Sequence, residues 1–591
     1  MKYACRIQDD LLVCTLKPDR PLSDAVFCFS GLAPLVPVNG GALIKSLGSY
    51  TEIALPEISA QETHEVSIKY AQGHRPANRA WMPLGPYLRI GDEIIELPPT
   101  PAGRRVENVK SPQAHSLIPL VPQPEIWKPA GDTIEIDGVQ IEGAALQSVA
   151  ALADRQGMVF RGSHPVRLQD EDLPQDAYRL MIDADAITIS ASSEGGQFYA
   201  GVTLLMLLRQ VSVPCGEIYD APRFGWRGQH LDTARHFYEP ESILALLDLM
   251  ALLKLNRFHW HFADDEAFRI DLETLPELTE KTALRGDGQF LPGLFNGAPV
   301  QGGSYSKDTV RQIISHAAAL NIEILPEIEA PAHALALAAI YPETRDPIDT
   351  GTETSVQGYT ANVLNPAMPK TWDILEKMVD EVGALFPFGH LHLGCDELPE
   401  HTWMGSPKAR ALMAQHGLKT TQDLQGWTIA KLAAYAVAQG LRPAAWEEAA
   451  QGSKGGIGNN AILFSWTGQG PGLDAARAGY DVVMTPAQHL YFDMAYTNDP
   501  DDWGASWAAF VDLPDTVNWD PVPDSRLSDQ VIGVQGAFWS EFTTEDGQMW
   551  PMLMPRMLGL AMMAWQRDRP EITDLLALAP SFAVNSVGRI A

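Results

Sequence analysis

The strongest constraint on the fold is a pattern of strand followed by helix that recurs through the chain from Arg227 onwards. Short apolar runs alternate with segments of helical periodicity such as 239–256 and 306–321. Pro240 lies where the first turn of a helix tolerates proline. Repetition of this kind predicts a barrel of eight parallel strands surrounded by helices. The expected strands are residues 228–235, 257–264, 322–329, 390–397, 442–449, 461–467, 481–487 and 531–539.

Two smaller units precede the barrel. Residues 1–97 contain short alternating runs separated by turns and no long amphipathic helix, which predicts a β-sandwich. Residues 98–130 are rich in proline and are expected to be a linker. Residues 131–219 mix strand-like and helical segments and predict a small α/β domain. We therefore expect a multidomain α/β protein whose barrel spans 220–591 and whose sandwich has a structural role.

Composition restricts the class of partner. The chain has 591 residues, 46% of them hydrophobic, which is enough for several cores. Its net charge of -31 repels nucleic acid and anionic membrane surfaces. The richest apolar stretch is interrupted by Asp248 and Lys254, so no membrane span is predicted. A small neutral or cationic substrate is the expected partner, with neither nucleic acid nor a membrane.

Two features bear on the location of the protein. Asp9 and Asp10 interrupt the N-terminal segment where a signal peptide needs an apolar core. The five cysteines are odd in number, lack metal-ligand spacing and are interpreted as free thiols. The sequence therefore predicts a cytoplasmic protein.

Catalytic groups of such barrels lie at the carboxyl ends of the strands. There, an apolar run stops at the adjacent acids Asp396 and Glu397. Two close carboxylates raise each other's proton affinity, so one remains ionised while the other holds a proton. Neighbours on a strand point to opposite sides, so this pair is not expected to flank one bond as nucleophile and acid. Thirteen of the 15 tryptophans lie at or beyond Trp226, and aromatic walls suit the apolar faces of sugars.

Six segments in chain order carry a resemblance to a known family. They are LDTARHFYEPESILALLDLMALLKLNRFHWHFADD, LPEIEAPAHALA, HLGCDELPEHTW, AAWEEA, LYFD and GVQGAFWSEF. Together they resemble glycoside hydrolase family 20, the β-N-acetylhexosaminidases, over residues 222–566. The segment QFYAGVTLLMLL resembles the end of the small domain that precedes the barrel in that family.

The resemblance implies a retaining exo-glycosidase in which the 2-acetamido oxygen of the substrate attacks the anomeric carbon to give an oxazolinium intermediate. It implies that Glu397 protonates the leaving oxygen and then deprotonates water. Asp396 would orient the acetamido N–H and stabilise positive charge, and Tyr491 would hydrogen-bond the acetamido oxygen. The implied substrates carry terminal N-acetylglucosamine, or also N-acetylgalactosamine, on chitooligosaccharides, glycan fragments or other glycoconjugates, and no metal or organic cofactor is implied.

Eight further residues acquire roles from the same resemblance. Arginine and carboxylates would hold the outer hydroxyls of the sugar, tryptophans would line the acetamido pocket and support the ring, and a His/Asp pair would tune the proton affinity of the acid. They are Arg235, Glu541 and Asp493 for the hydroxyls, Trp446, Trp466 and Trp539 for the walls, and His333 with Asp264 for the pair.

Two positions depart from the family pattern, because Ala332 and Cys395 replace glycines. Both add side-chain bulk beside the site. Three outcomes are open for the cysteine: it narrows the site, it makes the site sensitive to thiol reagents, or it packs as a small buried residue. Glu447, Glu448 and the acidic run 499–503 are interpreted as solvated surface.

Two other functions stay open on the sequence. A metal-dependent amidohydrolase would use the pairs His259 with His261 and His390 with His392 as ligands together with Asp396. A carbohydrate-binding protein without catalysis would rely on the N-terminal sandwich. Members of the resembling family can complete the site with a neighbour's loop, so a homodimer is also compatible with the sequence.

Overall fold

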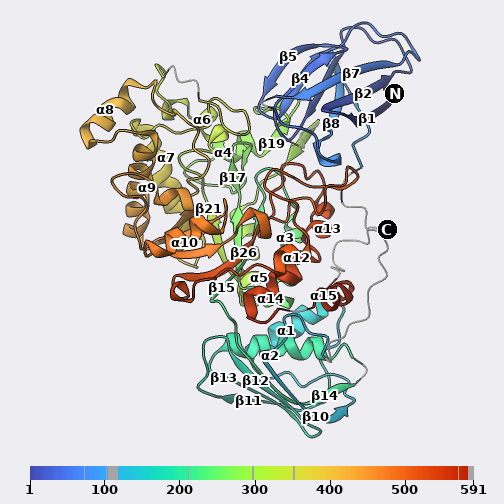
Figure 1. Cartoon of the computed structure of the whole chain (residues 1–591), viewed down its shortest axis with the longest axis vertical. Helices are drawn as coiled ribbons and strands as arrows, with labels where there is room; N and C mark the ends of the chain where they lie inside the picture. The colour runs from blue at the N-terminus through green and yellow to red at the C-terminus, as the bar shows by residue number, and fades with distance from the viewer. Residues whose placement is uncertain are drawn as a thin grey trace.

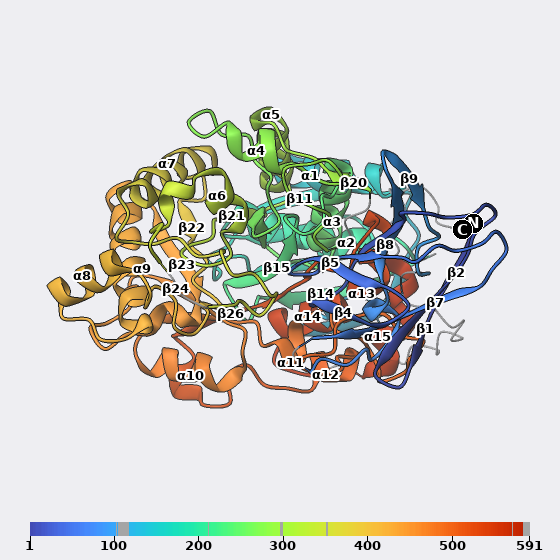
Figure 2. The same cartoon turned by 90° about the horizontal axis from the view of Figure 1, so that it is seen from above.

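The computed structural model describes the chain except residues 72, 102, 104–117, 211, 296–298, 350–352, 570 and 583–591. It contains a β-sandwich, a small α/β domain and a closed barrel, so the predicted fold class is confirmed. The sandwich and the small α/β domain lie at opposite ends of the barrel domain (Figure 1). Seen from above, the sandwich lies on the side of the barrel away from helices α7 to α9 (Figure 2).

The sandwich consists of two antiparallel sheets with the strand orders β1-β2-β7-β4 and β5-β6-β3-β8-β9. Side chains from both sheets, among them Leu12, Phe27 and Ile53, are fully buried in one core, as expected for alternating strands. The elements are β1 (Lys2–Gln8), β2 (Leu11–Lys17), β3 (Val26–Ser30), β4 (Leu35–Asn39), β5 (Ala42–Leu47), β6 (Tyr50–Ala54), β7 (His64–Tyr70), the 3₁₀ helix η1 (Arg79–Trp81), β8 (Leu84–Ile90) and β9 (Glu93–Glu96).

Part of the predicted linker, residues 102 and 104–117, lies outside the described residues. The described part that follows packs against the barrel domain, where the backbone N–H of Gln123 lies 3.2 Å from the sulfur of Met562. Strand β10 begins at Ile126, inside the segment predicted as linker.

The small α/β domain has a sheet of order β10-β14-β12-β13-β11. Helices α1 and α2 lie between this sheet and the barrel domain (Figure 1). The sequence analysis did not predict β11 and β14, in which polar residues interrupt the apolar ones. The elements are β10 (Ile126–Ile134), α1 (Gly143–Arg155), β11 (Val166–Asp170), β12 (Tyr178–Ile182), β13 (Ile187–Ala191), α2 (Glu194–Leu207) and β14 (Val213–Asp220).

The barrel contains all eight predicted strands, each parallel to its neighbours. It closes where Trp226 of the first strand pairs with Gly533 of the last. Every residue of the first strand is buried, because the barrel interior covers one face and the helices the other. The strands are β15 (Trp226–Asp232), β16 (Arg257–His261), β21 (Glu323–Glu327), β22 (His390–His392), β23 (Arg442–Trp446), β24 (Ile462–Ser465), β25 (Asp481–Met484) and β26 (Val531–Gly536).

Helices and short strands connect the barrel strands. Pro240 occupies the first turn of α3 as predicted, and the side chains of Thr420 and Asp423 form a capping box at the start of α9. No helix among the described residues is long and apolar enough to cross a membrane. The helices are α3 (Pro240–Leu252), α4 (Glu277–Thr282), α5 (Lys307–Ala319), α6 (Leu335–Ile340), α7 (Pro369–Leu385), α8 (Pro407–His416), α9 (Thr421–Ala438), α10 (Gln469–Arg477), α11 (Ala487–Leu490), α12 (Leu513–Val517), α13 (Met549–Leu553), α14 (Arg556–Trp565) and α15 (Ile572–Leu578), and the short strands are β17 (Ala263–Asp264), β18 (Ala267–Phe268), β19 (Leu284–Gly286) and β20 (Val300–Gly302).

Candidate active site

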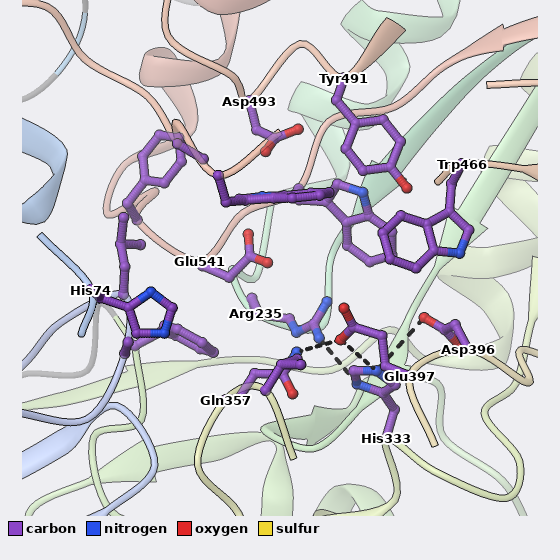
Figure 3. A pocket seen from close by; sticks show the side chains of 18 of the residues that line it. His74, Arg235, His333, Gln357, Asp396, Glu397, Trp466, Tyr491, Asp493 and Glu541 are labelled. Carbon is purple, nitrogen blue, oxygen red and sulfur yellow. Dashed lines mark hydrogen bonds and ion pairs between the residues drawn. The ribbon is translucent and has the colours of Figure 1, made fainter. Parts of the chain in front are cut away.

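A cavity of about 290 Å³ opens at the carboxyl ends of the barrel strands. Ten of the eleven residues assigned to the site from the sequence line it, and Asp264 lies beneath it. Asp493, Tyr491 and Trp466 lie across the cavity from His333, Gln357 and Glu397 (Figure 3). The lining residues predicted from the sequence are Arg235, His333, Asp396, Glu397, Trp446, Trp466, Tyr491, Asp493, Trp539 and Glu541.

A buried network of charges forms one side of this cavity. The Arg235 guanidinium lies 2.7 Å from Asp264 Oδ2 and 2.9 Å from Glu266 Oε2. The other oxygen of Asp264, Oδ1, lies 3.0 Å from His333 Nδ1. Because both carboxylates face a cation, each charge is compensated inside a site that excludes water.

The imidazole of His333 connects this network to the acid pair. Its Nε2 lies 3.4 Å from Glu397 Oε2 and 3.6 Å from Asp396 Oδ2, which are ion-pair distances (Figure 3). Burial acts to lower the pKa of His333, but the carboxylates of Asp264 and Asp396 raise it well above its usual value. The ring is therefore a cation shared between the two acids of the pair and Asp264.

The loop after β22 places both acids on the same cavity, so the expectation that they point to opposite sides is wrong. The strand ends at His392, and the backbone then turns through positive φ at Gly394 (68°), Cys395 (84°) and Glu397 (48°). Side-chain alternation holds only for extended backbone, and this segment is not extended. At Gly394 a Cβ would lie 1.8 Å from Glu329 Oε2, so glycine is required there.

The two acids have different proton affinities. Burial raises the pKa of Asp396 to about 6, and the charge of Glu327 contributes to this rise, while the cation of His333 opposes it. Burial also acts to raise the pKa of Glu397, but His333 and a hydrogen bond from Gln357 lower it below its usual value. Without substrate, Glu397 is thus the stronger acid of the pair.

Aromatic rings form the opposite side of the cavity. The rings of Trp466 and Tyr491 are stacked at 6.5 Å between centroids, and those of Trp446 and Trp539 are tilted at 5.9 Å. The indole N–H of Trp446 and one oxygen of Asp396 are buried and find no hydrogen-bond partner in the described part of the chain. Buried polar groups without partners are rare, so these atoms are suited to bind polar groups of a ligand.

Trp466 is held in place by two glutamates that the sequence analysis interpreted as solvated, which is wrong. Glu447 accepts a hydrogen bond from the Trp466 backbone at 2.7 Å, and both carboxylate oxygens of Glu448 lie 3.1 Å from the indole nitrogen of Trp466. Glu447 is buried and Glu448 half-buried. The misreading arose because both follow the last strand residue, where exposed acids are common.

Two further acids of the cavity have pKa values raised to near neutral pH. Burial raises the pKa of Asp493 to about 7, and it raises that of Glu541 to about 8 against the opposing charge of Arg235. One oxygen of Asp493 has no hydrogen-bond partner among the residues that the structure describes. A carboxyl group that is partly protonated near neutral pH can both donate to and accept from a sugar hydroxyl.

Several lining residues escaped the sequence analysis. Gln357 comes from the segment between α6 and α7 and donates a hydrogen bond of 2.9 Å to Glu397 Oε2. Trp507 comes from the segment between α11 and α12, and His74 and Trp81 come from the N-terminal sandwich. Contact between domains leaves no periodic pattern in the sequence, so only the aromatic character of Trp81 and Trp507 offered a signal.

The two departures from the family glycines do not enter the cavity. Cys395 is buried, and its carbonyl oxygen and sulfur both face the side-chain amide of Gln425, at 2.8 and 3.4 Å. Its φ of 84° lies in the left-handed region that favours glycine. Ala332 packs in a separate apolar cluster. Of the expectations for Cys395, the small buried residue is the one the structure supports.

The histidines proposed as metal ligands surround another residue. His392 Nδ1 lies 2.7 Å from Glu327 Oε1, and His261 Nδ1 lies 2.5 Å from Glu327 Oε2. His390 instead contacts the carbonyl of Phe388 at 3.0 Å. Groups of three side chains close enough for a metal ion occur among the described residues, but none of them includes Asp396. The ligand set of the amidohydrolase alternative is therefore not assembled.

Comparison with known proteins agrees with this geometry. The model of the catalytic domain of glycosyl hydrolase family 20 matches residues 224–568, and the model of domain 2 of that family matches residues 117–221. The chain belongs to glycosyl hydrolase family 20. It is therefore a glycoside hydrolase, and the amidohydrolase and non-catalytic alternatives are wrong.

Relatives within family 20 cover most of the chain. A β-hexosaminidase of Vibrio furnissii is 34% identical over 495 residues, which cover 80% of this chain and 81% of the relative. An N,N'-diacetylchitobiase of Vibrio harveyi is 28% identical and covers 76% of this chain, which spans 63% of that relative. A solved exo-β-N-acetylglucosaminidase of Vibrio harveyi, in complex with N-acetylglucosamine, has a TM-score of 0.87 at 27% identity and covers 98% of this chain and 96% of its own.

Proposed function

We propose that this family 20 enzyme is a retaining exo-β-N-acetylhexosaminidase that removes terminal β-linked N-acetylglucosamine. The observation that carries the proposal is the single cavity in which the pair Asp396 and Glu397 faces Tyr491 and the indole of Trp446. A carboxyl group, a phenol and an aromatic wall are the groups that recognise an acetamido substituent beside a scissile bond.

The reaction proceeds in two balanced steps. First, the acetamido carbonyl oxygen of the substrate forms a bond to the anomeric carbon, the bond to the leaving oxygen breaks, and the proton of Glu397 passes to that oxygen. Asp396 accepts a hydrogen bond from the acetamido N–H and compensates the positive oxazolinium, while Tyr491 donates to its oxygen. Second, water attacks the anomeric carbon and gives a proton to Glu397, and the bond between the anomeric carbon and the acetamido oxygen breaks. Two inversions retain the configuration.

Substrate has to reverse the proton affinities of the acid pair. An acetamido N–H donated to Asp396 stabilises its anion, which lowers the pKa of that carboxyl. A leaving group placed over Glu397 displaces water and adds a hydrogen-bond acceptor, which favours the protonated carboxyl. Productive protonation therefore depends on the acetamido group, and sugars without it are expected to react poorly.

Exo-cleavage follows from the closed end of the cavity. Arg235 is almost fully buried, and its ion pairs to Asp264 and Glu266 hold it there. With Asp493 and Glu541 beside it, this end is suited to the outer hydroxyls of one terminal sugar. The names of the Vibrio relatives support short chitooligosaccharides, and terminal N-acetylgalactosamine is a second candidate.

Release of nitrophenol from the aryl N-acetyl-β-glucosaminide tests the proposal. On chitobiose, whose leaving oxygen needs a proton far more than nitrophenol does, Glu397→Gln should lower kcat by about 10²- to 10⁴-fold. Glu400→Gln, an exposed acid in the same loop, is the matched control and should react like the wild type. A thiazoline mimic of the intermediate should inhibit competitively. Equal turnover by wild type and Glu397→Gln would contradict the role of the acid, and indifference to the thiazoline would contradict acetamido participation.

The cytoplasmic location and the homodimer stay predictions, which cell fractionation and light scattering can test.

A further inference from the structure

The N-terminal sandwich contributes directly to the cavity. Leu32, Ala33, His74 and Trp81 line it together with the catalytic acids. The sandwich also shares an apolar cluster with barrel loops, in which Cys28, Tyr50 and Tyr87 pack against Leu294, Leu335 and Tyr359. It is therefore more than the structural unit that the sequence predicted.

One barrel loop, residues 355–359 between α6 and α7, is clamped by the sandwich. Gly48 has a φ of 52°, and a Cβ there would lie 2.2 Å from Cε1 of Tyr359. At Gly358, with a φ of 84°, a Cβ would lie 2.3 Å from Cγ of Pro34. The loop is also a closed turn, because the backbone N–H of Ser355 donates a hydrogen bond of 2.8 Å to the carbonyl of Tyr359. Approaches this close leave the loop no room to move toward the sandwich.

The other face of the same loop reaches two charged groups of the site. Gln357 donates its amide N–H to Glu397 Oε2 at 2.9 Å (Figure 3). Tyr359 donates its hydroxyl to Glu266 Oε1 at 2.7 Å, and the second oxygen of Glu266 lies 2.9 Å from the Arg235 guanidinium. The loop thus connects the surface of the sandwich both to the proton donor and to the arginine.

A second set of contacts anchors the sandwich on the far side of the cavity. The Asn78 amide donates to the carbonyl of Gly504 at 3.0 Å, and Arg79 Nε donates to the carbonyl of Asp501 at 2.8 Å. These carbonyls belong to or adjoin the acidic run 499–503. Asp499 and Asp501 are exposed, as the sequence analysis predicted, whereas Asp502 and Trp503 are buried, so the prediction is wrong for these two. With anchors on both sides, the sandwich has a defined position over the cavity.

We propose that the sandwich contributes to catalysis by clamping residues 355–359. In the clamped loop, Gln357 positions the proton donor Glu397, and Tyr359 positions Arg235 through Glu266. The proposal rests on the proposed hexosaminidase activity and names Gln357 and Tyr359 as positioning residues. The sandwich then acts on turnover without contacting the reacting atoms.

A pair of glycine substitutions tests the clamp. Gly48 and Gly91 both lie in hairpin turns of the sandwich and have similar φ values of 52° and 56°. A Cβ at Gly91, however, would meet nothing within 4 Å. Alanine therefore brings the same backbone strain to both positions, and only Gly48→Ala presses on Tyr359. Displacement of catalytic groups by about 1 Å can cost about 100-fold, so Gly48→Ala should lower kcat by at least about 10-fold while Gly91→Ala stays within about twofold of the wild type. Equal activity of the two variants would overturn the proposal.

A second variant tests Gln357 itself. Gln357→Met keeps the length of the side chain and removes the donor to Glu397. The charged groups that face Glu397 are His333, Asp396 and Arg235, and all of them remain. Losing a donor to the ionised carboxylate raises the proton affinity of Glu397, so the basic limb of the pH profile of kcat should move to higher pH. A lower kcat with an unmoved basic limb would show a merely structural residue and would overturn the proposal.

The two sets of variants distinguish failure of the clamp from failure of the proposed hexosaminidase activity. If Gly48→Ala does not fold, as thermal unfolding would show, the pH profile of Gln357→Met decides alone. Failure of the proposed function would appear as no release of nitrophenol by the wild type. Failure of the clamp would leave the wild type active and give Gln357→Met the pH profile of the wild type.

Discussion

The two sides of the cavity differ in how many of their polar groups already have partners in the free protein. On the side of strands β15 to β22, Arg235, Asp264, Glu266 and His333 satisfy one another through ion pairs and hydrogen bonds. On the side of β23 to β26, the indole nitrogen of Trp446 is buried without a hydrogen-bond partner among the described residues. The ion pairs around Arg235 are thus formed in the free protein, whereas Trp446, and Asp396 at the edge of the charged side, keep polar atoms that can bind a ligand. Substitutions on the charged side should mainly lower the free energy of unfolding and change the pKa values of the catalytic acids. Substitutions on the aromatic side should mainly lower kcat and weaken substrate binding.

The largest expected effect is the loss of the central cation. Arg235→Ala removes the cation that contacts both Asp264 and Glu266, while Asp264 keeps its contacts to His261 and His333. This loss should lower the free energy of unfolding by about 3–5 kcal/mol. Urea unfolding measures it. Arg526→Ala, which removes a guanidinium that is 86% exposed, should change the free energy by less than about 1 kcal/mol. If Arg235→Ala unfolds like Arg526→Ala, the charged side is not the self-supporting network described above.

The next effect is a pH dependence of stability beneath the charged side. Burial acts to lower the pKa of His261, but Glu327 and Asp264, at 2.5 and 2.7 Å, raise it to about 10. A folded-state pKa above the usual 6.5 stabilises the protein fully below pH 6.5, and this stabilisation is lost as pH rises towards about 10.

Thermal unfolding across this range checks the sign. The midpoint for the wild type should fall between pH 6.5 and 10, whereas His261→Gln, which cannot be protonated, should unfold at lower temperature with a smaller fall over the same range. Parallel curves for the two proteins would contradict a protonated His261.

The comparison also explains what the sequence revealed about the fold. All eight barrel strands were predictable, because each is an apolar run of the same kind bounded by a helix. Strands β11 and β14 were not, because polar residues interrupt their apolar pattern. The docking of the sandwich escaped prediction as well, since it rests on Gly48, Pro34 and Asn78, whose contacts are set by a partner far away in the chain.

For the site, the residues at strand ends were predictable and their supports were not. Asp396 and Glu397 interrupt a buried run, which is a local signal, and the roles came from the resemblance. Gln357 lies in a loop whose sequence has no periodicity, and only the folded backbone brings it to Glu397. The orientation of the acid pair depends on positive φ at Cys395, a residue type from which that conformation is not expected.

A third prediction addresses the aromatic side. Tyr491→Phe removes the hydroxyl proposed to donate to the acetamido oxygen, and the ring contacts to Trp466 and Trp539 remain. Loss of one hydrogen bond to a group that becomes charged should lower kcat by about 10- to 100-fold. The urea midpoint should change little, in contrast to Arg235→Ala. A large loss of stability with normal turnover would show that the two sides do not differ as described.

The smallest effect concerns the support of Trp466. Burial raises the pKa of Glu448 well above its usual value, and the charges of Glu447 and Asp396 add to the rise. A carboxyl group that is protonated near neutral pH resembles an amide, and the carbonyl of glutamine can still accept from the indole N–H of Trp466. Glu448→Gln should therefore keep KM within about twofold of the wild type, whereas Glu448→Ala, which loses a hydrogen bond of about 1 kcal/mol, should raise it about fivefold. If Glu448→Gln behaves like Glu448→Ala, then the ionised form holds Trp466, and the aromatic side depends on charge as much as the opposite side does.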